Sequence, residues 1–197
     1  MKALEDYIAF DLEFNQYEGA YQIIQVSAVR FTDGKEVDHY DSYVYTDKPL
    51  KSFINGLTGI TQDKIQNAPQ LEQVLSEFKA FVGDRPLIGY NAKKSDLPIL
   101  LENGLDLEEQ YAVDVFDEAF ERRPSDLHGI KNLQLHTVAE FLGVAGKSHD
   151  SLEDARMTAL VYEQFLEFDQ GRTLLDEQEN FSTNPFGGLD LSGFFDE

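Results

Sequence analysis

Between residues 7 and 14, large apolar side chains alternate with smaller or polar ones. This period of two predicts a β-strand, and both of its faces are apolar at the start, as expected for a strand inside a sheet. Residues 22–31 are rich in β-branched side chains and predict a second strand. The segment Thr32-Asp33-Gly34-Lys35 is typical of a hairpin turn, after which residues 36–46 return as a third strand.

After residue 66 the apolar period alternates between that of a helix and that of a strand. A meander of three strands followed by this alternation predicts an α/β fold, with a mixed sheet and helices packed on it. We place that domain at residues 1–170. The helices are expected at residues 67–82, 95–102, 133–142 and 150–168, and the strands at residues 86–90 and 111–116.

Residues 171–197 differ in character and are expected to form a flexible acidic tail. Residues 180–193 combine Ser, Thr, Asn, Pro and Gly without an apolar period, and Phe194 and Phe195 follow them. Exposed aromatic pairs are typical of short docking peptides. The tail therefore either binds a protein partner or is a frayed chain end.

The composition favours a globular protein and limits its chemistry. Hydrophobic residues make up 42% of the 197-residue chain, enough for a substantial core. No apolar run reaches the roughly 20 residues of a membrane span, and the first residues lack a signal-peptide stretch, so we expect a cytoplasmic location and no membrane partner. The absence of cysteine excludes thiolate chemistry and leaves oxygen and imidazole ligands, which favour Mg²⁺ or Mn²⁺.

The net charge of −21 opposes a nucleic-acid substrate, because phosphates are normally bound by Lys and Arg. The predicted tail holds one Arg and six acidic residues, so it accounts for −5 and leaves −16 upstream. We therefore expect weak, salt-sensitive capture of nucleic acid unless a partner protein delivers it. The alternative interpretation is that the acidic surface only keeps the protein in solution.

Asp11 and Glu13 lie two residues apart on the first predicted strand, so their side chains leave the same face while Leu12 points into the core. A charge inside a sheet needs a partner, and a metal ion is the natural one; the alternative is an ordinary solvated strand end. Carboxylates about 4 Å apart repel by about 4 kcal/mol at an effective dielectric near 20, so converging acids imply a cation.

A second candidate segment follows the strand predicted at residues 86–90. Asp96 stands at the start of the next helix, either as a metal ligand or because the helix dipole favours an acid there. Lys93 and Lys94 in the preceding loop either meet substrate phosphates or are solvated.

A third segment precedes the last predicted helix. Asp150 as N-cap and Glu153 three residues later form a capping box, which explains both acids structurally. Asp154 is left over as a fixed ligand, and His149 on the approach loop is a candidate mobile general base. The alternative is a surface histidine beside a helix cap.

Together these segments resemble, over residues 6–168, the DEDDh (DnaQ-like) 3′→5′ exonuclease family, whose fold is ribonuclease H-like. Leu57-Thr58-Gly59-Ile60-Thr61 matches the family's Thr-Gly-Ile-Thr turn, and Asp114 sits where its mid-domain strand carries an aspartate. The three motifs that carry the resemblance are Asp11-Leu12-Glu13, Tyr90-Asn91-Ala92 with Asp96, and His149 to Asp154.

The resemblance implies a metal-dependent hydrolase that releases nucleoside 5′-monophosphates from single-stranded DNA or RNA 3′ ends. His149 would deprotonate the attacking water, assisted by Glu13. Two Mg²⁺ or Mn²⁺ ions would be bound by Asp11, Glu13, Asp96 and Asp154. Substrate contacts are expected from Leu12, Phe14, Asn15, Asn91, Lys93 and Lys94.

Three departures from the family pattern stand out. Phe14 follows Glu13, where the family usually has Thr, and Tyr90 replaces a His. Asp96 comes five residues after Asn91 instead of the usual four. DNA of the proofreading or repair type is favoured slightly over RNA. The competing hypothesis is a catalytically weak or inactive binding module of nuclease fold that docks to a replication or repair partner.

Overall fold

The structure is a computed structural model that describes residue 1 and residues 3–144 and 150–183. None of the helices described there is long and apolar enough to cross a membrane. The strands are β1 (Asp6–Tyr17), β2 (Ala20–Thr32), β3 (Lys35–Tyr43), β4 (Leu87–Gly89) and β5 (Tyr111–Asp114); the helices are α1 (Ser52–Thr58), α2 (Gln62–Ile65), α3 (Leu71–Val82), α4 (Asp96–Glu102), the 3₁₀ helix η1 (Glu108–Gln110), α5 (Val115–Arg122), α6 (Leu135–Phe141) and α7 (Ser151–Thr183).

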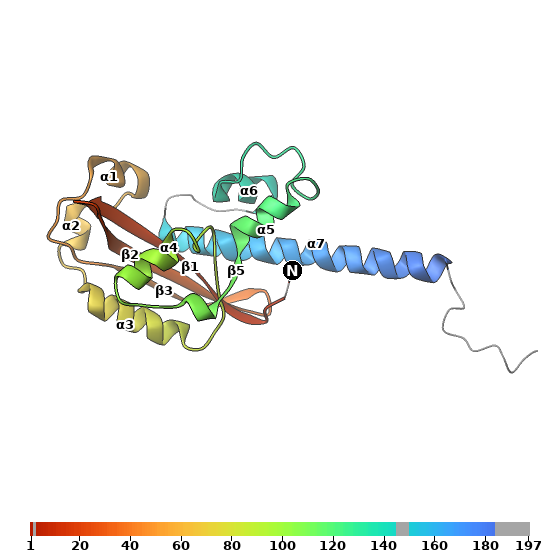
Figure 1. Cartoon of the computed structure of the whole chain (residues 1–197), viewed down its shortest axis with the longest axis horizontal. Coiled ribbons are helices and arrows are strands. Elements are labelled where there is room, and N and C mark those ends of the chain that lie inside the picture. Colours follow the sequence, from red (N-terminus) through yellow and green to blue (C-terminus); the bar gives the residue numbers. More distant parts are fainter. Residues whose placement is uncertain (2, 145–149, 184–197) are drawn as a thin grey trace, which may run out of the picture.

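The strands form one mixed sheet in the order β3-β2-β1-β4-β5 (Figure 1). β1 pairs antiparallel with β2, and β2 with β3, whereas β4 runs parallel to β1 and β5 parallel to β4. The register of β1 against β2 shifts between Glu13 and Phe14. The predicted mixed sheet is confirmed, and β1 is the inner strand that its apolar pattern indicated.

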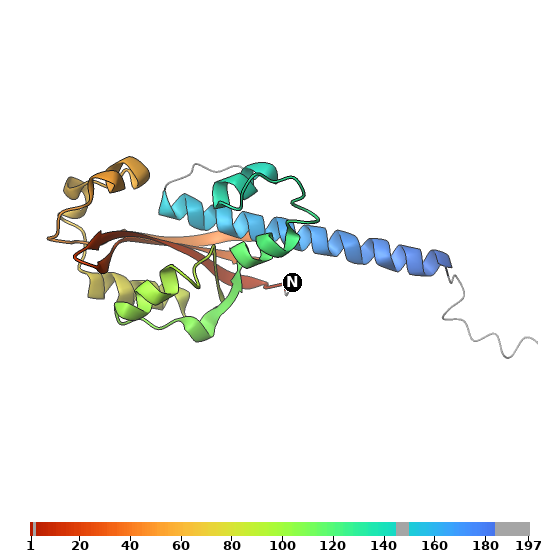
Figure 2. The same cartoon turned by 45° about the horizontal axis from the view of Figure 1, so that its top comes forward.

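Helices cover both faces of the sheet, which explains why β1 is apolar on both sides (Figure 2). On one face, Tyr7 and Ala9 of β1 belong to a core that includes Phe165 of α7. On the other face, Phe10 belongs to a core that includes Phe78 of α3, with the two ring centroids 6.0 Å apart. The odd-numbered residues of β1 therefore face α7.

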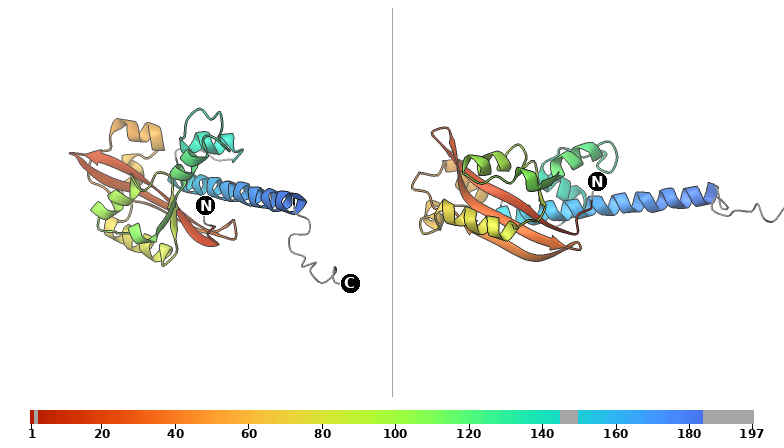
Figure 3. Two further views of the ribbon diagram at one scale, coloured as in Figure 1. Left: turned by 45° about the vertical axis from the view of Figure 1, so that its right-hand side comes forward. Right: turned by 60° about the horizontal axis from the view of Figure 1, so that its bottom comes forward.

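Helix α7 is longer than the sequence predicts. It continues beyond residue 168 to Thr183 and projects past the rest of the domain (Figure 3). Leu174 and Leu175 are 60% and 61% exposed there, so these apolar side chains do not pack on the domain. Residues 171–183, which we expected to belong to the tail, are helical in the structure. Residues 184–197, with the predicted docking peptide, lie outside the described residues.

A second difference concerns the strand predicted at residues 111–116. The strand ends at Asp114, and α5 begins at Val115, because the Asp114 carboxylate accepts a hydrogen bond of 3.1 Å from the Phe116 backbone N–H and caps the helix. The short helices α1 and α2, which the apolar period did not reveal, also lie in the connection between β3 and α3.

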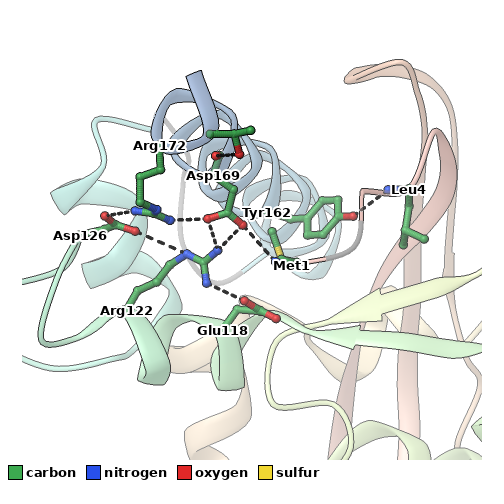
Figure 4. Close-up of polar contacts among 9 residues, drawn as sticks. Met1, Leu4, Glu118, Arg122, Asp126, Tyr162, Asp169 and Arg172 are labelled. Carbon is green, nitrogen blue, oxygen red and sulfur yellow. Dashed lines mark hydrogen bonds and ion pairs between the residues drawn. The ribbon is translucent and has the colours of Figure 1, made fainter. Parts of the chain in front are cut away.

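A buried arginine fixes α5 against α7. The Arg122 guanidinium donates to Glu118 at 2.6 Å and to Asp169 of α7 at 2.8 Å (Figure 4). It also lies 4.8 Å from the centre of the Phe165 ring. Arg172 of α7 in turn donates to Asp126 at 2.6 Å. Charges this buried require such partners, so the network sets the position of α7 along the sheet.

The close approach of β4 to the following loop leads to a prediction about Gly89. A Cβ at Gly89 would lie 2.5 Å from the Cβ of Ala92, so Gly89→Ala should lower the free energy of unfolding by about 1–3 kcal/mol. The matched control is Gly56→Ala in α1, where a Cβ meets nothing within 4 Å and should stabilise by about 0.5–1 kcal/mol. Urea unfolding of both variants measures the difference, and equal stabilities would contradict the packing described.

Candidate active site

Strand β1 places the first two candidate carboxylates. Asp11 and Glu13 continue the odd-numbered face that packs against α7, and both are half-buried. Leu12 points to the opposite face, where it is 4% exposed within the core against α3 and α4. Leu12 can therefore contribute its backbone, and not its side chain, to this face of the sheet.

Asp96 is held against β1 by that backbone. It is the first residue of α4 and only 5% exposed. The Leu12 N–H donates to Asp96 Oδ1 at 3.1 Å, and the Ser95 hydroxyl donates to Asp96 Oδ2. Ser95 is the N-cap residue of α4, but its side chain makes no capping hydrogen bond, because the hydroxyl lies against Asp96 and the Asn91 carbonyl.

The start of α7 brings the third segment to the same place. The Ser151 hydroxyl donates to the Asp11 backbone carbonyl at 2.9 Å, which ties the first turn of α7 to β1. Asp150 accepts hydrogen bonds from the N–H groups of Leu152 and Glu153 at 3.1 and 3.3 Å, so its predicted role as N-cap is confirmed. Asp154 follows in that first turn and is half-buried.

The pKa values show that the acids from the three segments interact. Burial, followed by repulsion from Asp96, Glu13 and Asp154, raises the pKa of Asp11 well above its usual range. Burial and repulsion from Asp154 and Asp96 raise the pKa of Glu13 to about 7. Burial also raises the pKa of Asp96 to about 6, although the hydrogen bonds from Ser95 and Leu12 oppose this. Residues distant in sequence thus form one site.

The donor set fits a hard divalent cation. All four groups offer carboxylate oxygen, and a cation among them would relieve the repulsion that contributes to the raised pKa values of Asp11 and Glu13. Within residues 3–144 and 150–183, no three His, Asp or Glu side chains are yet arranged to hold one ion. The side chains would therefore have to turn toward a cation as it binds.

Asp114 anchors the loop that leads to Asp96. Its Oδ1 accepts from the Asn91 N–H at 2.8 Å, and its Oδ2 accepts from the Lys93 N–H at 3.3 Å. Asn91 has a φ of 59°, a left-handed conformation that needs such support. Asp114 therefore connects the ends of β4 and β5 and fixes the loop from which Asp96 projects.

The other residues expected to contact substrate differ in how far they are exposed to solvent. Lys93 and Lys94 are exposed in the loop that Asp114 anchors. Phe14 is half-buried and packs edge-on against Tyr21, with ring centroids 5.3 Å apart. Asn15 is fully buried, so a substrate contact from its side chain would require rearrangement.

The Asn15 amide instead organises the entry to α1. Its Nδ2 donates to the Pro49 carbonyl at 3.2 Å and its Oδ1 accepts from the Lys51 N–H at 3.1 Å. His149, the expected base, lies outside the described residues.

Sequence reasoning missed a polar group on the neighbouring strands. Ser27 pairs with Asp11 and Gln25 with Glu13 in the β1–β2 register, and both are buried. Their side chains each donate to Asp41 Oδ1 of β3 at 2.8 Å. Two polar residues at alternate positions of an apolar strand were the available signal, because they continue the polar face across the sheet.

Comparison with known proteins gives a consistent family match. A family model described as Exonuclease (RNase_T) matches residues 8–162. DNA polymerase III PolC-type of Thermotoga petrophila is 32% identical over 166 residues, which cover 81% of this chain and 12% of the polymerase. The same enzyme type from Caldanaerobacter subterraneus is 30% identical over 164 residues, 82% of this chain and 12% of the polymerase. The chain thus spans about an eighth of these relatives.

Solved structures share the fold. The nuclease domain of 3′hExo, a DEDDh family member bound to rAMP, has a TM-score of 0.67 and 21% identity, over 83% of this chain and 92% of that one. Exonuclease I of E. coli, in complex with a 5cy-dA13 oligonucleotide, has a TM-score of 0.67 and 15% identity, over 82% and 40%. The expected ribonuclease H-like fold is confirmed.

The raised pKa values predict a specific pH dependence of stability without divalent metal. Because the folded pKa of Glu13, about 7, exceeds the unfolded value near 4.5, the folded protein binds more protons in between. The stabilisation from protonated Glu13 should be complete below about pH 4.5 and lost as the pH rises through 7. Glu13→Gln should therefore lose less stability than wild type between pH 5 and pH 8 in urea unfolding with EDTA.

The control for this measurement is Glu72→Gln, at an exposed position of α3 on the other face of the sheet. It should follow the wild-type dependence. A Glu13→Gln variant that also follows the wild-type curve would contradict the crowding of carboxylates described above.

Proposed function

We propose that this chain, which belongs to the exonuclease family, hydrolyses the terminal phosphodiester at the 3′ end of a single-stranded nucleic acid and releases a nucleoside 5′-monophosphate. The observation that carries the proposal is the convergence of Asp11, Glu13, Asp96 and Asp154 near the end of β1, where burial raises the pKa of the first three and repulsion from neighbouring site acids adds to the shifts of Asp11 and Glu13. A binding module would not need this repulsion, whereas hydrolysis with divalent cations uses it.

The four carboxylates have distinct settings in this proposal. Asp11 and Glu13 project from a rigid inner strand, while the Leu12 N–H and the Ser95 hydroxyl orient Asp96 toward them. Two divalent cations, Mg²⁺ or Mn²⁺, held by these groups would supply positive charge at the attacking and leaving oxygens. Glu13, whose pKa lies near neutrality, also suits a role beside the attacking water.

His149 is the proposed proton acceptor. It directly precedes Asp150, the N-cap of α7, so the chain leads it to the helix turn that carries Asp154. The ordinary imidazole pKa near 6.5 allows a histidine to take a proton from water at neutral pH. A base on the segment before α7 would act beside the carboxylates of Asp154 and Glu13.

The relatives favour DNA as the substrate. The polymerases from Thermotoga petrophila and Caldanaerobacter subterraneus synthesise DNA by name, and they are more similar to this chain than 3′hExo, which was solved with rAMP. A proofreading or repair exonuclease is thus the proposed class. The net charge of −21 supports delivery of the strand by a partner protein, since long-range attraction of phosphates is weak.

Activity on labelled strands tests the proposal. With Mn²⁺, wild type should shorten 5′-labelled single-stranded DNA from its 3′ end and release 5′-monophosphates, and should act more slowly on RNA. His149→Ala should lower the rate by about 10²- to 10⁴-fold through loss of the base. Asp11→Ala should lower it at least as much, because it removes a central carboxylate.

Two variants provide matched controls at exposed positions remote from the site. His128→Ala and Asp84→Asn should keep the wild-type rate. Wild-type protein that degrades neither polymer would favour the alternative of a nuclease-fold binding module. Full activity in both Asp11→Ala and His149→Ala would reject the assigned site.

A further inference from the structure

A groove lies beside the proposed active site, between the end of β4 and the starts of α5 and α6. It encloses about 400 Å³ and is lined mostly by apolar and aromatic groups. In Figure 1, α5 and α6 are neighbours on the side of the sheet near the first turns of α7. The residues that line the groove include Tyr90, Asn91, Phe116, Leu133, Gln134 and His136.

The aromatic wall of the groove is already assembled. The Tyr90 and Phe116 rings meet edge to face, with centroids 5.8 Å apart and an interplanar angle of 87°. The Tyr90 hydroxyl donates to the Leu133 carbonyl at 2.6 Å, which joins this wall to the segment before α6. Asp114 bonds to the backbone N–H groups of both Asn91 and Phe116, so one carboxylate fixes two sides of the groove.

The groove and the carboxylates lie at the same end of the sheet. Tyr90 and Phe116 follow the carboxyl ends of the parallel strands β4 and β5, and β4 is the direct neighbour of β1. Ligands bind at such strand ends in open α/β sheets. Asn91, which lines the groove, also begins the loop that carries Asp96. A polymer whose end lies at the carboxylates can therefore extend into this groove.

The charges at the rim suit a phosphate backbone. The Lys94 ammonium lies 5.9 Å from the centre of the Phe116 ring, and Lys93 is exposed next to it. Among the described residues neither lysine forms an ion pair, although the chain as a whole carries −21. His136 and Gln134 are exposed on the opposite side and offer hydrogen-bonding groups. Aromatic walls beside free cations are typical of single-strand binding surfaces.

From this geometry we propose that the groove is a second nucleotide subsite, which binds a base upstream of the scissile phosphodiester while Lys93 and Lys94 contact the adjoining phosphates. The inference rests on the proposed exonuclease function and adds a specificity determinant to it. Phe116 provides the apolar contact for the base, and Tyr90 holds that ring in place. Strands too short to reach the groove should be poorer substrates than longer ones.

Kinetics on single-stranded DNA with single abasic positions tests the subsite. Phe116→Leu keeps an apolar side chain but removes the ring, so it should raise KM about tenfold and change kcat little. His136→Ala should raise KM by a smaller factor. The matched control is Phe120→Ala, one turn along α5, where the ring is 60% exposed and does not line the groove; it should leave KM unchanged. Thermal unfolding confirms that each variant folds.

The abasic substrates separate base contact from a general structural effect. With wild type, removal of one particular upstream base should raise KM by about the same tenfold factor. With Phe116→Leu, removing that base should have no further effect. Equal sensitivity of wild type and Phe116→Leu at every upstream position would overturn the proposal.

Binding of a 3′-blocked strand, measured by fluorescence anisotropy with Mn²⁺, separates this proposal from the proposed function. If the wild type is inactive but its affinity for the strand still depends on Phe116, the proposed exonuclease function is rejected. The groove then remains supported as a strand-binding site. An active wild type whose KM and binding are both independent of Phe116 would reject the groove alone. If the groove instead binds another kind of molecule, such as a peptide, the affinity for DNA should likewise be independent of Phe116.

Discussion

The burial of mutually repelling carboxylates near the end of β1 is the constraint around which this domain is organised. Burial and repulsion from neighbouring acids raise the pKa values of Asp11 and Glu13, so the surrounding structure must hold these side chains in place. Asp11 and Glu13 pair with Ser27 and Gln25 of β2, just beyond the stretch of β1 that also pairs with β4. The Leu12 N–H holds Asp96, and Ser151 ties α7 and its Asp154 to the Asp11 carbonyl. Burying these carboxylates disfavours the folded state, and the same groups attract cations.

Much of this site could be predicted because its parts have local causes. The period of two along residues 7–14 indicated that Asp11 and Glu13 share a face, and in the structure Tyr7 and Ala9, at alternate positions of the same strand, pack in the core with α7. The cap at Asp150 is likewise set by neighbouring residues, and the structure shows its hydrogen bonds. That left Asp154 as the candidate ligand in the same turn, and its effect on the pKa of Glu13 is consistent with this.

Other features depend on contacts between distant residues, and the sequence alone did not reveal them. The buried contacts of Asn15 with Pro49 and Lys51 were not foreseen, because these partners come from a connection whose path the apolar pattern does not specify. The role of Asp114 depends on how close β5 brings it to Asn91. Residues 171–183 continue α7, and the exposed side chains of Leu174 and Leu175 there give no apolar period that would indicate a packed helix.

The central claim is that these carboxylates form one cation site. Titration of Mn²⁺ into the protein at pH 7.5, followed by calorimetry, measures it most directly, with the nearly isosteric Asp11→Asn variant beside wild type. The account predicts binding of about two ions per chain in wild type and a clear loss of affinity in Asp11→Asn, at unchanged folding. Equal Mn²⁺ binding by the two proteins, or none by wild type, would contradict it.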